Sequence, residues 1–176
     1  AGTRSHSVAA WLGSERILPP MPNTPALVGQ GMTALFARPA VSEDDKARVE
    51  RVIATTGEHL WVAEEPQLDA VTALSGSGPA YVFYFLVAMV QAGSEMGLPP
   101  GDARRLAVAT FAGASGLARA SQEPLQTLRE RVTSKGGTTY AALTSMAQSG
   151  LADHFVDAMK DARKRAGELG DEFGKG

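Results

Sequence analysis

Eleven consecutive apolar residues, from Ala80 to Val90, constrain the fold of this chain more than any other feature. The run contains no charged residue and is longer than an ordinary strand, so it favours a helix that is apolar on every side. Because such a helix has no face suited to water, we expect other helices or a second subunit to enclose it. The run itself is too short to cross a bilayer, which needs about 20 apolar residues.

The composition excludes several classes of function. Seventeen Lys and Arg stand against 19 Asp and Glu, giving a formal charge of −2, without the basic excess of a nucleic-acid-binding or membrane-surface protein. The chain has no cysteine, and its three histidines lie far apart in sequence, so we expect no disulfide, thiolate nucleophile or metal centre. The charge balance favours a protein that acts on a small molecule or binds another protein. A start without the basic-then-apolar layout of a signal peptide, together with the short apolar run, predicts a cytoplasmic protein.

The pattern of elements changes near Glu64 and predicts two domains. Before this point short helices alternate with short apolar runs, which is typical of an α/β layer. After it no strand pattern recurs, and one helix signal follows another. We therefore predict part of an α/β domain over residues 1–64 and an all-helical domain over residues 65–176. The expected helices are 4–13, 42–57, 68–74, 79–96, 102–120, 124–132, 139–149 and 151–169, and the expected strands are 16–21, 31–37 and 59–63.

Two of these helices indicate how the second domain packs. In helix 102–120 small residues recur at four-residue steps and leave flat stripes where another helix can cross closely. Helix 151–169 combines one apolar stripe with an opposite charged face, so it is amphipathic. Together with the apolar run, this is more apolar surface than the domain covers alone, and we expect a homodimer or a larger assembly. The small residues are Ala109 and Gly113 on one stripe, and Ala112, Gly116 and Ala120 on the other.

The stretch 132–139 is the strongest candidate for a binding site. Two glycines, Gly136 and Gly137, let the backbone approach a ligand, and a helix beginning at Thr138 or Thr139 offers unpaired N–H groups that suit a carboxylate or phosphate. The Glu or Gln of a capping box is missing three residues later. In the alternative interpretation Thr138 only caps its helix and the glycines form a turn. The local sequence leaves both possibilities open.

Three further segments are weaker candidates. Ser75–Gly76–Ser77–Gly78–Pro79 opens a helix, and is either a close approach to a ligand or a tight joint between packed helices. Asn23 lies in a rigid turn between two prolines, and turn chemistry explains it as well as ligand binding does. Glu65 precedes Pro66 at the predicted boundary, where a carboxylate could meet an amine, although most such glutamates are simply solvated.

Four blocks of this sequence, MPNTPALVGQG, LDAVTALSGSGPAYVF, GLPPGDARRLA and VTSKGGTTYAAL, resemble those of the pyrroline-5-carboxylate reductases. The likeness runs over essentially the whole chain. It implies the last third of a Rossmann domain followed by an all-α helical dimerisation domain, with subunits that form dimers and larger rings such as decamers. The Gly-rich phosphate-binding turn of such a domain would lie before Ala1, so we expect this piece alone not to hold the cofactor and to be inactive.

The resemblance also implies a reaction, the last step of proline biosynthesis. NADPH or NADH would give a hydride to the C=N carbon of 1-pyrroline-5-carboxylate and form L-proline. Thr139 would be the candidate catalytic residue, acting by hydrogen bonding, because a threonine hydroxyl is too weak an acid to protonate a nitrogen readily. The implied substrate-binding residues are Glu65, Ser134, Gly136, Gly137, Thr138 and Thr139, and the implied cofactor-binding residues are Ala1, Gly2, Asn23 and Arg131.

Two departures from the family pattern and two alternatives remain. Lys135 replaces the usual proline of the glycine loop, and Pro19 stands where many relatives carry Arg. A related dehydrogenase acting on a hydroxy acid would need a lysine base, and neither central helix of the second domain contains one. A chain that serves only for dimerisation, without activity, is the other alternative.

Overall fold

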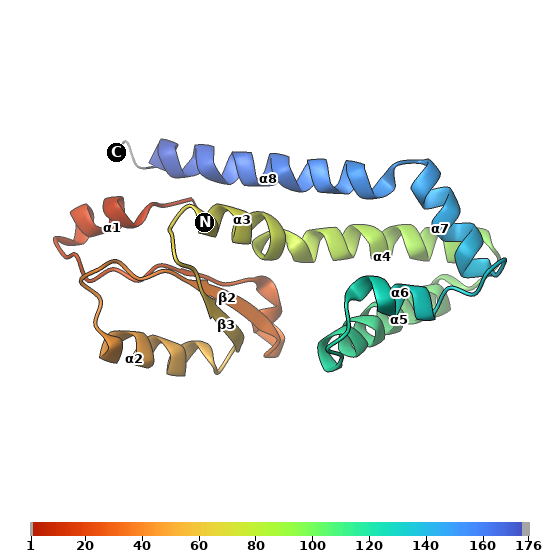
Figure 1. The fold of residues 1–176 in the computed structure, drawn as a ribbon, viewed down its shortest axis with the longest axis horizontal. Helices are drawn as coiled ribbons and strands as arrows, with labels where there is room; N and C mark the ends of the chain where they lie inside the picture. Colours follow the sequence, from red (N-terminus) through yellow and green to blue (C-terminus); the bar gives the residue numbers. More distant parts are fainter. Residues whose placement is uncertain (1, 174–176) are drawn as a thin grey trace. The chain divides into compact units, whose positions relative to one another are not determined.

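The computed structural model describes residues 2–173. Contacts divide the chain into two compact units, which are described separately (Figure 1). The sheet unit consists of the chain up to Tyr81 together with the chain from Val156 onward, and the helical unit consists of Val82–Phe155. The domain boundary expected at residue 64 was inferred from the order of strands and helices along the chain. A division based on contacts does not test it, so it stays a prediction.

A three-stranded sheet in the order β1-β2-β3 forms the centre of the sheet unit. β1 (Pro20–Met21) is antiparallel to β2 (Gly31–Leu35), and β3 (Gly57–Trp61) is parallel to β2. Ala34 and Leu35 of β2 are fully buried, so the middle strand contributes the centre of the core. All three predicted strands are present, and β1 is confined to the edge as its prolines require.

Helices and turns complete this layer. α1 (Ser5–Leu12) precedes the sheet, and α2 (Glu43–Ile53) contacts β3 (Figure 1). Ser42 is the N-cap of α2, as predicted, and forms a capping box with Asp45. The helix ends at Ile53, four residues earlier than expected, because Gly57 already begins β3. The predicted turn around Asn23 is followed by a 3-10 helix, η1 (Thr24–Val28).

Every described element after β3 is helical, which confirms the predicted fold class. A π-helical turn, η2, ends within the segment 75–79, at Gly76, and α4 begins two residues later. In the helical unit the rings of Phe85 and Phe155 meet edge to face, with centroids 5.6 Å apart. The elements are α3 (Gln67–Val71), η2 (Thr72–Gly76), α4 (Gly78–Glu95), α5 (Pro100–Ala120), α6 (Leu125–Arg131), α7 (Thr138–Gln148) and α8 (Leu151–Phe173).

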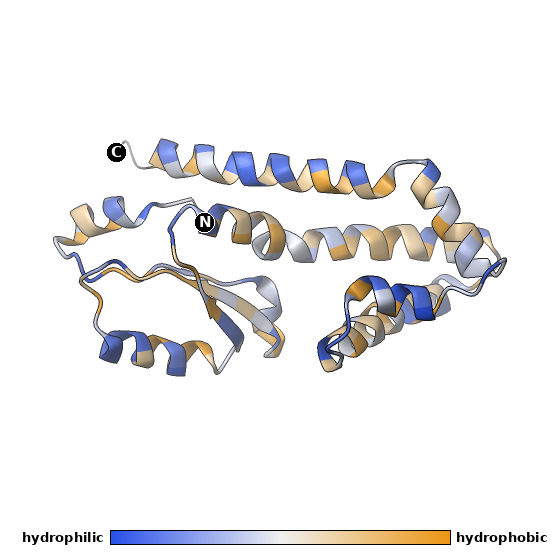
Figure 2. Cartoon of the chain, viewed as in Figure 1, coloured by the Kyte–Doolittle hydropathy of each residue, from blue (hydrophilic) through white to orange (hydrophobic). Residues whose placement is uncertain are grey.

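The helix α4 is apolar along most of its length (Figure 2), yet several of its large side chains are exposed. Phe83, Tyr84 and Val87 are 62%, 74% and 67% exposed. The small-residue stripes of α5 are also uncovered, since a Cβ added at Gly113 or Gly116 would meet nothing within 4 Å. The close crossing predicted there is therefore absent among the described residues, and enclosure of α4 by a second subunit stays a prediction.

The helical stretch Gln67–Glu95, which joins α3, η2 and α4, is long and apolar enough to cross a membrane. The sequence analysis considered only the apolar run Ala80–Val90, which is too short to cross a bilayer. The structure places that run within a longer continuous helical stretch. Length and composition alone do not distinguish a membrane span from a helix covered by a protein partner.

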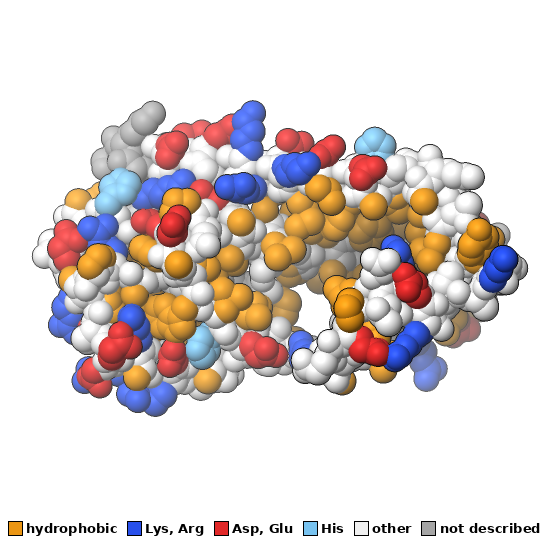
Figure 3. Space-filling model, viewed as in Figure 1, with side chains coloured by type: hydrophobic (Ala, Val, Ile, Leu, Met, Phe, Trp, Pro, Cys, Tyr) orange, Lys and Arg blue, Asp and Glu red, His pale blue; other side chains and the backbone are white. Residues whose placement is uncertain are grey.

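The last helix, α8, is amphipathic as predicted. Its charged side chains gather on one face (Figure 3), whereas Ala166 and Gly170 on the opposite side are buried. This buried side reaches the amino-terminal segment of the sheet unit, because a Cβ added to Gly2 would lie 3.0 Å from the Cβ of Leu169.

Candidate functional site

The glycine loop before α7 forms a tight turn. Gly136 has a φ of +74°, in the left-handed region that favours glycine. The N–H of Gly137 donates a hydrogen bond of 3.0 Å to the carbonyl oxygen of Ser134 and closes the turn. A Cβ added to Gly137 would lie 2.8 Å from Ser134 Oγ, so a larger residue does not fit without movement. The sequence places glycine at both positions where this backbone needs it.

The start of α7 keeps its amide groups uncapped. Gly137 is the N-cap, so Thr138 is the first helical residue, and no described side chain caps the helix. No acidic residue occupies the first turn, and Lys135 lies beside it in the loop. The interpretation in which Thr138 caps its own helix is therefore wrong. Free N–H groups, the positive end of the helix dipole and a lysine together suit an anion.

A second candidate lies in the sheet unit, around the segment that precedes α1. Gly2, Arg4, Glu65 and Asp69 line one pocket of about 170 Å³. Two of the predicted site residues, Gly2 and Glu65, are thus brought together although they are far apart in sequence. The pocket is large enough for a small ring but not for a dinucleotide.

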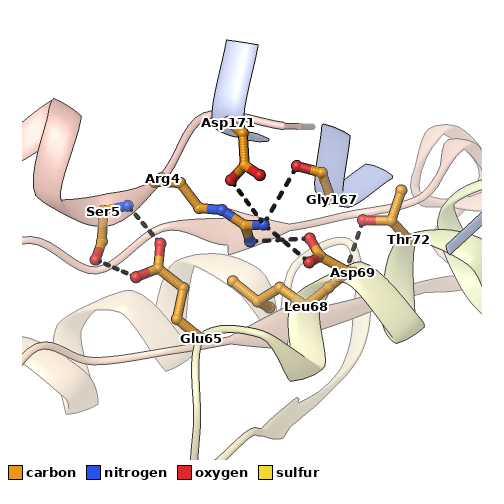
Figure 4. Close-up of polar contacts among 8 residues, drawn as sticks. All are labelled: Arg4, Ser5, Glu65, Leu68, Asp69, Thr72, Gly167 and Asp171. Carbon is orange, nitrogen blue, oxygen red and sulfur yellow. Dashed lines mark hydrogen bonds and ion pairs between the residues drawn. The ribbon is translucent and has the colours of Figure 1, made fainter. Parts of the chain in front are cut away.

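Glu65 holds the start of α1 (Figure 4). One carboxylate oxygen accepts a hydrogen bond from the backbone N–H of Ser5, and the other accepts one of 2.6 Å from Ser5 Oγ. Ser5 is fully buried, and its hydroxyl also accepts a longer bond of 3.3 Å from Arg38. A carboxylate at a helix N-terminus is favourable because it satisfies an unpaired amide and the helix dipole. The glutamate is therefore engaged within the chain and is not simply solvated.

Arg4 and Asp69 are site residues that the sequence analysis missed. The guanidinium of Arg4 binds both carboxylate oxygens of Asp69, each at 3.0 Å, and these hydrogen bonds raise the pKa of Arg4 (Figure 4). Both side chains are mostly buried. The two residues are 65 positions apart, and no local sequence pattern reveals that they meet.

The other two predicted cofactor contacts have partners inside the chain. The side-chain oxygen of Asn23 accepts a bond of 2.9 Å from the N–H of Met32, and its amide group donates one of 3.0 Å to Ser75 Oγ. Arg131 forms a bidentate ion pair with Glu123, at 2.5 and 2.6 Å, on the surface of the helical unit. Their roles toward a cofactor stay predictions.

The predicted site residues therefore form two groups. Gly2, Glu65 and Asn23 belong to the sheet unit. The loop residues and Arg131 belong to the helical unit. Ala1 lies outside the described residues.

The family model and the curated relatives that match this chain indicate the same family. Residues 65–169 match the family described as pyrroline-5-carboxylate reductase dimerisation. A pyrroline-5-carboxylate reductase of Pseudomonas aeruginosa is 41% identical over 176 residues, which cover 99% of this chain and 64% of that protein. One of Pisum sativum is 36% identical, over 96% of this chain and 62% of that protein. The chain thus spans less than two thirds of the length of these curated relatives.

Solved structures give the same result for the fold. A pyrroline-5-carboxylate reductase from Coxiella burnetii has a TM-score of 0.91 and 38% identity, covering 96% of this chain and 63% of that one. A pyrroline carboxylate reductase of Plasmodium falciparum, solved with NADP bound, has a TM-score of 0.88 and 30% identity, covering 96% of this chain and 68% of that one.

Proposed function

The chain belongs to the pyrroline-5-carboxylate reductase family, and from this we propose that it takes part in the reduction of 1-pyrroline-5-carboxylate to L-proline, with NADPH or NADH as the reductant. Family membership carries this proposal. The uncapped amides at the start of α7 support it, because the substrate carries a carboxylate and α7 offers a place for one.

In this proposal the glycine loop anchors the substrate. The N–H groups at the start of α7 bind the carboxylate, and Lys135 adds a positive charge beside them. Ser134 and Thr138 line the same turn, and Thr139 donates or accepts a hydrogen bond at the ring nitrogen. No described residue is assigned as the proton donor, because a threonine hydroxyl is too weak an acid. The proton comes with the protonated imine or from water.

The residues around Gly2 fit only the reacting end of a nicotinamide cofactor. The pocket of about 170 Å³ has room for a ring, and the backbone of Gly2 borders it without a side chain. The sequence contains no G-x-G-x-x-G turn for the phosphates. When bound, the cofactor supplies the hydride. In the proposal Gly2 and Asn23 border its ring, and Glu65 keeps the Gly2 segment in place through its bonds to Ser5.

The proposal includes a homodimer in the cytoplasm. Exposed apolar side chains on α4 and the uncovered stripes of α5 are surfaces that a second copy would cover. In the proposal dimers assemble further into larger rings, such as decamers. The surfaces of α4 and α5 do not identify the contacts between dimers. The absence of cysteine is compatible with a reducing compartment.

Substitution of Thr139 tests the proposed site in the complete protein. We expect Thr139→Ala to lower kcat/KM for imine reduction by about tenfold to a hundredfold, the equivalent of 1.5 to 3 kcal/mol for one hydrogen bond to a charged group. Thr144→Ala is the matched control, because Thr144 lies on the same helix and its hydroxyl only bonds the carbonyl oxygen of Tyr140.

Two other measurements separate the alternatives. A titration of the complete protein with NADPH asks whether it binds a nucleotide, as a protein that serves only for dimerisation would not. Parallel assays with a cyclic imine and with a hydroxy acid distinguish the two reductase classes. Equal kcat/KM for the wild type and Thr139→Ala would remove Thr139 from the site.

A further inference from the structure

Arg4 connects three segments of the sheet unit that are distant in sequence (Figure 4). Its guanidinium binds Asp69 of α3 through two hydrogen bonds and also donates to the carbonyl oxygen of Gly167 in α8, at 3.5 Å. Asp171, one helical turn further along α8, lies 4.0 Å from the same guanidinium. The backbone of Arg4 caps α1, where its carbonyl oxygen accepts bonds from Ser7 and Val8.

The surface of α8 is shaped for this arginine. A Cβ added at Gly170 would lie only 2.5 Å from Arg4 Nε, and one at Gly167 would lie 3.6 Å from an Asp69 oxygen. Residues three apart share one face of a helix, so the two glycines form a flat site for the guanidinium. Near the carboxyl end of a helix a cation is also favoured by the helix dipole.

The Gly2 segment is held by the same contacts. Gly2 lies against Leu169 of α8, and Arg4 follows two residues later. On the other side of Arg4, Ser5 is held by Glu65 through both its N–H and its hydroxyl. The short segment between Gly2 and Ser5, which borders the pocket, therefore depends on α3 and on the end of α8 for its position.

We propose that Arg4 is a positioning residue, which uses Asp69 and the last turns of α8 to hold the Gly2 backbone in the geometry that the reaction needs. The effect of Arg4 on the reaction rests on the proposed function. The clamp itself, defined as Arg4 with Asp69, Gly167 and Gly170, can be measured without activity. In this arrangement α8 orders the pocket wall although none of its side chains lines the pocket.

The first test is amide hydrogen exchange of the complete protein without cofactor. In Arg4→Met we expect exchange to become about tenfold faster in two places, the end of α8 and the first turn of α1, which is the size expected from losing a charge-assisted hydrogen bond. Arg165→Met is the matched control. Arg165 lies on α8 and, among the described residues, pairs with Glu168 and Glu172 at the surface rather than with the segment before α1. The control should speed exchange at the end of α8 little and leave α1 unchanged.

A second variant keeps the arginine and removes its place on α8. Gly170→Ala forces the guanidinium away from the helix, while alanine favours the helix itself, so the protein should fold. If Arg4 acts as proposed, this variant reproduces the faster exchange in the first turn of α1. Unchanged exchange in both Arg4→Met and Gly170→Ala would overturn the clamp.

The second test is steady-state kinetics on the same proteins. We expect kcat to fall by about tenfold in Arg4→Met, with a smaller change in the KM for the imine, because a displaced Gly2 backbone misaligns the reactants rather than releasing the substrate. Arg4→Lys should recover only part of kcat, since an ammonium cannot bind Asp69 in the bidentate manner. Faster exchange with unchanged kcat would overturn the positioning role, whereas a wild type inactive on the imine would refute the proposed function and leave the exchange result standing.

Discussion

Single residues in this chain act mainly through charge pairs and helix ends. Asp45 is an example, because one carboxylate both completes the capping box with Ser42 and binds Arg16 at 2.6 Å. Hydrogen bonds from Arg16, and then from Ser42, lower the pKa of Asp45 to about 2. The same chemistry places Glu65 at the start of α1.

The lowered pKa of Asp45 predicts how the stability of the sheet unit depends on pH. An unfolded aspartate has a pKa of about 3.9, so the stabilisation is fully present above that value and is lost as the pH falls toward about 2. We expect the difference in free energy of unfolding between the wild type and Asp45→Asn to shrink between pH 5 and 2. Urea unfolding at several pH values measures it, and a difference independent of pH would contradict the assignment.

Among the elements, the loop before α7 depends most closely on its sequence. A turn with a left-handed Gly136 leads straight into a helix that lacks a side-chain cap, so its first amides stay free. The contrast with α2 is informative, because there Ser42 and Asp45 satisfy the same groups. One helix start is closed for stability, and the other is left open.

Gly137→Ala should disturb this loop. The added Cβ would lie 2.8 Å from Ser134 Oγ, so the turn has to widen and the amides at the start of α7 lose their alignment. We expect the KM for the imine to rise by about tenfold, or 1.4 kcal/mol, with little change in melting temperature. Gly101→Ala is the control, because a Cβ there meets nothing within 4 Å. An unchanged KM would show that the turn does not anchor the substrate.

For the molecule as a whole, the main feature is apolar surface that one chain does not cover. Most buried apolar side chains belong to the sheet unit, whereas in the helical unit, among the described residues, only those of Ala103 and Ala107 are buried. Burial of apolar area drives association as well as folding. A second copy of the chain is therefore the expected source of the missing contacts for α4.

Val87→Glu tests this expectation. Val87 is 67% exposed on α4, so a charge there is harmless to a monomer, but in an interface it is an unpaired buried carboxylate that costs about 3 to 5 kcal/mol. We expect sedimentation at micromolar concentration to show a dimer or larger assembly for the wild type and a smaller species for the variant. Lys164→Glu, on the charged face of α8, is the control. A folded wild-type monomer would contradict the dimer.

The order and type of the elements could be predicted from the chain because they depend on local patterns. Apolar periodicity, the Ser42 cap and the glycines at 136 and 137 act within a few residues, so the strands, the helices and the turn before α7 follow from them, whereas the uncapped start of α7 was left open by the sequence and decided by the structure. The 3-10 helix after Asn23 and the π-helical turn at 72–76 were not predicted, since each depends on how neighbouring segments pack.

Contacts between distant residues could be decided only by the tertiary structure. Arg4 and Asp69 are 65 positions apart, and Arg4 and Gly167 are 163 apart, and no local pattern links such pairs. A charged side chain has the same sequence signature whether it faces water or a partner, because its interaction is set by the folded backbone and the burial around it. Local chemistry therefore specified the glycine turn before α7, whereas the clamp around Gly2 exists only once α1, α3 and α8 are packed together.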